Sequence, residues 1–219
     1  MLTILLSRLS AACNTIPTAQ DWLISVGILL IYGLIALPLG FWQGFLQMQV
    51  ASSERLVLGT KVRIALTALV APAVIEELVF RVLLLPYPMA GLPTKIWWLW
   101  AIFGLLLFII YHPLNALSFF PAGFPTFLDP IFLMLAGFLG LGCTFIYWQT
   151  SSVWLAVVIH WVVVVVWLLW LGGYQKLGSI PMEAGGVGEA EGAEEAGGER
   201  NLVSWRAAIE ESISTKIKD

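Results

Sequence analysis

Residues 71–81 read APAVIEELVFR, and this stretch decides how the rest of the chain must be arranged. It places Glu76, Glu77 and Arg81 inside a hydrophobic run, residues 64–85, that is long enough to cross a bilayer. An ionisable residue at that depth costs about 2.5–3.5 kcal/mol on insertion, so such residues usually face a protein interior and carry a function. The stretch therefore predicts a membrane helix that contributes to a polar site.

The spacing of these charges separates the two carboxylates. Glu77 and Arg81 are four residues apart, so they share one helical face, and the acid precedes the base, which is the favourable order. Glu76 is rotated by about 100° from Glu77 around the helix axis. One carboxylate can therefore pair with the arginine while the other stays free to react.

The composition predicts an all-α integral membrane protein, a polytopic transmembrane bundle with short interfacial helices. Of the 219 residues, 59% are hydrophobic and 11% are charged, against about 25% charged in an ordinary soluble domain. Residues 130–175 contain no Asp, Glu, Lys or Arg. The buried core of a soluble protein of this length would not contain such long uncharged stretches. The sequence contains no basic patch with interleaved aromatic residues, so nothing in it indicates nucleic-acid binding. The five predicted spans are residues 22–40, 64–85, 96–117, 131–147 and 153–171.

The remaining segments divide the chain further. Residues 1–21 are interpreted as an interfacial lead-in, with a signal-like start and a frayed end as alternatives. The transmembrane domain is assigned to residues 22–180. Residues 181–200 are rich in Gly, Glu and Ala and are predicted to be a disordered linker. Residues 201–219 have apolar residues at helical spacing, which indicates either an amphipathic helix or a loosely structured tail that could bind a partner.

Loop charges predict the orientation. The connection at residues 41–63 carries three basic residues, whereas that at residues 86–95 carries one and the turn at residues 149–152 carries none. The positive-inside rule places the first connection in the cytoplasm. With five spans, the C-terminal tail then lies in the cytoplasm as well.

The two histidines of the chain, His112 and His160, both lie in hydrophobic stretches on other spans than the acidic pair. Pro113 follows the first histidine directly and is predicted to end or kink its helix. A lone intramembrane histidine is often only a hydrogen bonder between helices, but two Glu, two His and one Arg in one small membrane body indicate a functional cluster. Cys13 and Cys143 have no metal or redox spacing and are interpreted as packing residues.

Three motifs follow one another in separate hydrophobic spans. They are E-E-x-x-x-R (Glu76, Glu77, Arg81), F-x-x-x-H (Phe108, His112) and a histidine in a late span (His160). In this order and context, residues 64–171 resemble the CAAX prenyl protease and bacteriocin-processing family, also called the Abi family, of glutamate-dependent intramembrane endopeptidases.

The resemblance implies a role for each motif residue. Glu76 would be the general base that activates a water molecule, and His112 would help to hold that water. His160 would stabilise the oxyanion of the tetrahedral intermediate. Glu77 and Arg81 would hold the motif helix in place. The substrate would be a membrane-associated protein or peptide in the lipid bilayer, and no cofactor or metal would be needed.

One position departs from the family's pattern. The last motif often has Asn or Asp four residues after its histidine, and here that position is Val164. Loss of one oxyanion donor can reduce the rate by about 10²–10³-fold. Asn115, three residues after His112, is the nearest candidate substitute in sequence.

Two other classes of function fit the same residues. Two His and two Glu could bind zinc, although no H-E-x-x-H motif occurs and Arg81 disfavours a nearby cation. Intramembrane Glu and His residues also form proton or solute paths. A membrane scaffold that keeps the fold without cleaving is a further alternative, and Val164 favours it.

Overall fold

The computed structural model describes residues 2–48 and 56–177, and within these ranges the chain forms helices and no strand. The predicted all-α class is therefore confirmed. Four helices are long and apolar enough to cross a membrane, and they match four of the five predicted spans. They are α2 (Ala19–Trp42), α5 (Thr94–Ser118), α6 (Pro130–Thr150) and α7 (Val153–Trp170). The predicted linker at 181–200 and C-terminal segment at 201–219 lie outside the described residues.

The remaining predicted span, residues 64–85, is divided among three shorter helical segments. These are α4 (Leu58–Ala68), η1 (Leu69–Glu76) and η2 (Leu78–Leu83), and the last two have the π-helical hydrogen-bond pattern. Helical residues run without a break through all three segments. Pro72 lies inside η1, where its missing N–H and its ring disrupt the bond to the fourth preceding carbonyl. A wider i→i+5 turn accommodates that disruption.

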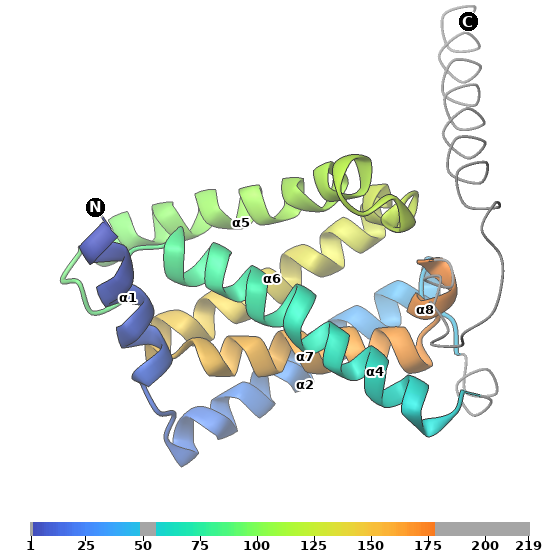
Figure 1. Ribbon diagram of the computed structural model, residues 1–219, viewed down its shortest axis with the longest axis horizontal. Helices are drawn as coiled ribbons and strands as arrows, with labels where there is room; N and C mark the ends of the chain where they lie inside the picture. Colours follow the sequence, from blue (N-terminus) through green and yellow to red (C-terminus); the bar gives the residue numbers. More distant parts are fainter. Residues whose placement is uncertain (1, 49–55, 178–219) are drawn as a thin grey trace, which may run out of the picture. The chain divides into compact units, whose positions relative to one another are not determined.

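Helices α6 and α7 form the centre of the bundle. Helix α6 packs against α5, α7 and α2, and α7 also packs against α4 and η1. Figure 1 shows α6 and α7 lying between α5 on one side and α2 on the other. Helix α2 leaves Leu23, Leu30 and Leu34 exposed on its outer face, as expected for a surface in contact with lipid.

Local sequence signals start two of the spans. Helix α2 begins with a capping box, in which the Thr18 side chain accepts from the Asp21 N–H and the Asp21 carboxylate accepts from the Thr18 N–H. Helix α6 begins at Pro130, and the Asp129 carboxylate accepts from the N–H of Ile131. These caps satisfy N–H groups that the helix itself leaves unpaired.

Short elements complete the described part of the chain. They are α1 (Leu2–Asn14), η3 (Pro121–Gly123), η4 (Thr126–Leu128) and α8 (Gly173–Lys176). Helix α1 packs against η2 and α7. The hydroxyl of Ser152 donates to the Thr15 carbonyl at 2.8 Å, and the indole of Trp154 donates to the Cys13 carbonyl at 2.7 Å. The lead-in segment is thus attached to the start of α7.

Pro113 was predicted to end or kink its helix. Helix α5 continues through Pro113 to Ser118, so the proline does not end it, because packing against the neighbouring helices outweighs one lost backbone hydrogen bond. The turn predicted at residues 149–152 is confined to Ser151 and Ser152, since α6 extends to Thr150. Ser151 adopts the left-handed conformation, with φ of 59°, and so ends the helix within one residue.

Candidate functional site

The two adjacent carboxylates lie at the junction of the two π-helical segments. Glu76 is the last residue of η1, and Glu77 connects η1 to η2. Glu77 is fully buried, whereas Glu76 retains 8% of its surface exposed. Their environments differ, as the rotation between consecutive helical residues requires.

Glu77 pairs with Arg81, which confirms the pairing expected from their spacing. The Nε atom of Arg81 lies 3.1 Å from Oε2 of Glu77, as an ion pair rather than an aligned hydrogen bond. The other end of the guanidinium donates to the Gly140 carbonyl of α6 at 2.9 Å. Its carbon lies 4.7 Å from the centre of the Phe108 ring on α5, a distance at which a cation and an aromatic face attract. Arg81 thereby joins three helices.

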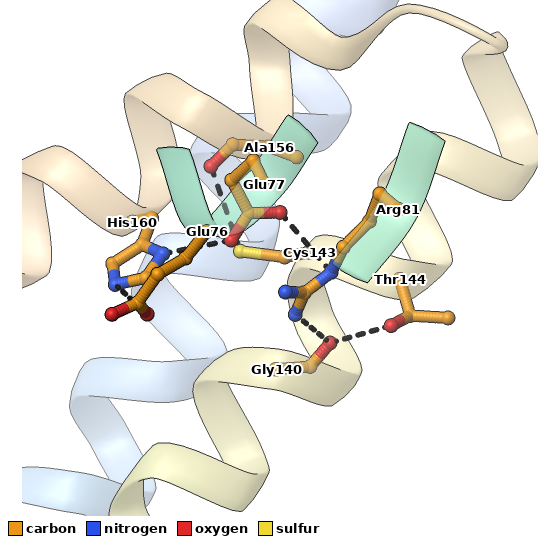
Figure 2. Close-up of polar contacts among 8 residues, drawn as sticks. All are labelled: Glu76, Glu77, Arg81, Gly140, Cys143, Thr144, Ala156 and His160. Atoms are coloured by element: carbon orange, nitrogen blue, oxygen red, sulfur yellow. Dashed lines mark hydrogen bonds and ion pairs between the residues drawn. The ribbon is translucent and has the colours of Figure 1, made fainter. Parts of the chain in front are cut away.

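His160 on α7 connects the two carboxylates (Figure 2). Its Nδ1 lies 2.7 Å from Oε1 of Glu77, and its Nε2 lies 3.8 Å from Oε2 of Glu76. A carboxylate only accepts, so the short contact places a proton on Nδ1. Glu77 therefore fixes the orientation of the ring and directs Nε2 toward Glu76.

His112 on α5 is held by its own helix. Its Nδ1 lies 2.8 Å from the Phe108 carbonyl, and because a carbonyl only accepts, Nδ1 carries the proton and Nε2 is left as an acceptor. The rings of Phe108, Phe127 and Phe132 surround it at centroid distances of 4.8, 5.6 and 5.3 Å. These edge contacts fix the plane of the imidazole.

A cavity of about 490 Å³ brings these groups together. Glu76, His112 and His160 all line it, and they come from three different helices. Most of the remaining wall is aliphatic or aromatic. Glu77 and Arg81 are not among the described residues of the wall but are buried behind it. The site thus consists of one carboxylate and two imidazoles at an apolar cavity, supported by a buried ion pair.

Residues 58–166 match the family described as type II CAAX prenyl endopeptidase, Rce1-like. The matched range contains every motif residue of the site. The chain belongs to this CAAX protease family. No curated protein and no solved structure gave a match.

The family is a protease family. Val164, which stands where the family often has Asn or Asp, lines the cavity, and so does the candidate substitute Asn115. Val164 lies one helical turn after His160, and Asn115 lies about one turn after His112. The amide of Asn115 is half-buried.

Several contacts of this candidate site had no signal in the sequence. Gly140 supplies a backbone carbonyl that accepts both from Arg81 and, at 2.7 Å, from the hydroxyl of Thr144. The sequence shows only that Ala136 and Gly140 are small residues four positions apart, a spacing that permits close helix contact. Cys143 is fully buried, and its thiol donates weakly to the Ala156 carbonyl at 3.5 Å. It contributes packing, as expected, together with this link between α6 and α7.

The zinc alternative requires the two histidines and two glutamates to form one group. Within residues 2–48 and 56–177, no three His, Cys, Asp or Glu side chains are grouped so that they could hold a metal ion. The Nδ1 atom of His112 is hydrogen-bonded to the Phe108 carbonyl, and the Nδ1 atom of His160 is hydrogen-bonded to Glu77. These two nitrogen atoms are therefore already engaged within the protein.

Proposed function

We propose that this CAAX protease family member is an active intramembrane endopeptidase, which hydrolyses a peptide bond in a membrane-associated protein or peptide. One observation carries the proposal. Of two adjacent buried glutamates, Glu77 is committed to Arg81 and His160, while Glu76 opens onto a cavity shared with two imidazoles. A carboxylate with this freedom, at a cavity that is large enough for water and has a mostly apolar wall, has the properties of a general base.

In the proposed reaction, Glu76 takes a proton from a water molecule as the water oxygen attacks the substrate carbonyl carbon. Glu76 lines the cavity and keeps 8% of its surface exposed, so its carboxylate can contact the water. The tetrahedral intermediate then breaks its C–N bond. Glu76 returns the proton to the leaving amine, and the products are a carboxylic acid and an amine.

The two histidines act on either side of this carboxylate. Nε2 of His112 is an unshared acceptor that can hold the attacking water. Nε2 of His160 faces Glu76 and would donate to the oxyanion. Donation from Nε2 while Nδ1–H bonds Glu77 requires an imidazolium, and the Glu77 carboxylate stabilises that charge.

Glu77 and Arg81 are proposed as positioning residues. They do not line the cavity, but their contacts with His160, Gly140 and Phe108 fix the helices that do. Catalytic geometry is sensitive to displacements of about 1 Å. The protein is an integral membrane protein, and we propose, from the basic residues of its loops, that the C-terminal tail is cytoplasmic.

The test compares wild-type protein with Glu76→Gln in phospholipid vesicles. The probe is a farnesylated, internally quenched peptide that ends in a CAAX sequence. Peptidomics of membranes that contain either form serves as a second, unbiased readout. Cleavage is expected to disappear in Glu76→Gln while its thermal unfolding stays close to that of wild type. Asp21→Asn is the matched control, because it neutralises a carboxylate that only caps α2.

Two results contradict the proposal. One is wild-type turnover in Glu76→Gln. The other is the absence of any Glu76-dependent product in both readouts, which would favour the alternative of a scaffold that keeps the family fold without cleaving. Proton or solute flux in the same vesicles, measured in both forms, tests the remaining alternative of a conducting protein.

A further inference from the structure

At position 164, where a polar side chain could donate a hydrogen bond to the oxyanion, the cavity wall has the aliphatic side chain of valine. Val164 lies one turn after His160 and lines the cavity, but its side chain cannot donate a hydrogen bond. If Glu76 and His112 serve the water, only His160 remains among the proposed groups to donate to the oxyanion. Peptide hydrolysis generally uses more than one such donor.

Tyr111, which carries a phenol hydroxyl, is part of the wall of the same cavity. It precedes His112 in α5 and lines the wall together with Glu76, His112 and His160. Its ring is held at centroid distances of 5.4 Å from Phe80 and 5.7 Å from His112. The Tyr111 hydroxyl forms no hydrogen bond with any described residue.

We propose that Tyr111 is a further catalytic residue, whose hydroxyl donates a hydrogen bond to the oxyanion of the tetrahedral intermediate and so replaces the donor that Val164 lacks. The proposal rests on the proposed peptidase function of Glu76. The phenol keeps its proton throughout, so the balance of the hydrolysis is unchanged. A preorganised neutral donor in an apolar cavity stabilises developing negative charge strongly, because little water competes with it.

Asn115 is a further polar residue of α5 in this wall, but its position is less favourable. It lies one full helical turn, about 5–6 Å, beyond Tyr111 along the axis. Ring contacts fix Tyr111 beside His112, whereas the Asn115 side chain forms no hydrogen bond with a described residue. The rigid ring also loses little conformational freedom when it donates. Tyr111 is therefore the better placed donor.

The first experiment measures kcat and KM for Tyr111→Phe, which removes only the hydroxyl. The probe is the farnesylated quenched peptide, or the Glu76-dependent peptide found by peptidomics if wild type does not cut the former. We expect kcat to fall by about 10²–10³-fold, the usual effect of deleting one oxyanion donor, with little change in KM. Thermal unfolding should match that of wild type.

Tyr147→Phe is the matched control. The hydroxyl of Tyr147 is buried and, like that of Tyr111, has no hydrogen-bond partner among the described residues, but Tyr147 is not a residue of the cavity wall. Its removal should leave kcat unchanged. Equal kcat values for Tyr111→Phe and Tyr147→Phe would overturn the proposed role of Tyr111.

The second experiment adds Val164→Asn to both wild type and Tyr111→Phe. If the two side chains serve the same oxyanion, the asparagine should raise kcat more in Tyr111→Phe than in wild type, as a non-additive pair. Equal effects in the two backgrounds would contradict a shared role. Glu76→Gln separates the two levels of the argument: cleavage that needs Glu76 but not Tyr111 removes only this inference, whereas cleavage that does not need Glu76 removes the proposed function.

Discussion

His160 and Glu77, which are 83 residues apart in sequence, form a direct contact between their side chains, with 2.7 Å between Nδ1 and Oε1. The same carboxylate balances the charge of Arg81 through its other oxygen. Glu77 therefore couples the orientation of an imidazole at the cavity to a fully buried cation. Glu76, one residue earlier, neither forms this contact with Nδ1 of His160 nor pairs with Arg81. The two acids should therefore respond differently to the same substitution.

Glu77→Gln should destabilise the protein far more than Glu76→Gln. The amide can still accept from His160, but it leaves the Arg81 cation buried without a counter-charge, which costs about 3–5 kcal/mol. Glu76 Oε2 has no hydrogen-bond partner among the described residues, so its loss removes little stabilisation. Thermal unfolding in detergent measures both variants. Equal melting temperatures for the two variants would show that Glu77 does not have this structural role.

The sequence predicted where the membrane helices lie but not how their side chains meet. Uncharged apolar runs located α2, α5, α6 and α7 to within a few residues, because length and composition alone determine whether a segment can cross a bilayer. The pairing of Glu77 with Arg81 was also predictable, since it is local. The choice of Glu77 rather than Glu76 as the partner of Nδ1 of His160 depends on how α7 packs against η1 and η2, which no local pattern encodes.

Gly140→Ala should destabilise the contact between α5 and α6. A Cβ atom there would lie 2.7 Å from Cδ1 of Leu105 and 3.0 Å from Cδ1 of Phe108, and overpacking of this kind costs about 1–3 kcal/mol. A displaced Phe108 would also move the carbonyl that holds His112, so kcat should fall too. Gly27→Ala is the control, because nothing lies within 4 Å of its added Cβ. Similar unfolding temperatures for both variants would contradict the close approach at Gly140.

The role of Gly140 shows a second limit of the sequence. Its carbonyl accepts from Arg81 and from Thr144, yet every residue has a carbonyl, so a backbone acceptor leaves no trace in residue identity. The same holds for the Phe108 carbonyl that orients His112. Conversely, Pro113 is a strong local signal for a helix end, and packing in the bundle overrode it.

Arg81→Lys should be intermediate in stability between wild type and Arg81→Met. Lysine keeps a positive charge near Glu77, but it lacks the planar fork that reaches Glu77, Gly140 and the Phe108 face together. Loss of the hydrogen bond to a buried carbonyl costs about 1–3 kcal/mol. Methionine also leaves Glu77 uncompensated, which adds the larger cost of an unpaired buried charge. Unfolding midpoints test this order, and a methionine variant more stable than the lysine variant would reverse it.

Pro72→Ala should reduce cleavage without reducing stability. Pro72 lies four residues before Glu76 inside the π-helical segment η1, and alanine restores the N–H that favours an ordinary α-helical turn. Tightening that turn would rotate Glu76 away from His160 Nε2, now 3.8 Å from its carboxylate. A shift of about 1 Å can cost up to about 10²-fold in rate. Pro38→Ala is the control, because Pro38 also lies inside a helix but is not among the described residues of the cavity wall. If Pro72→Ala retains the kcat of Pro38→Ala, the π-helical register does not set the position of the carboxylate.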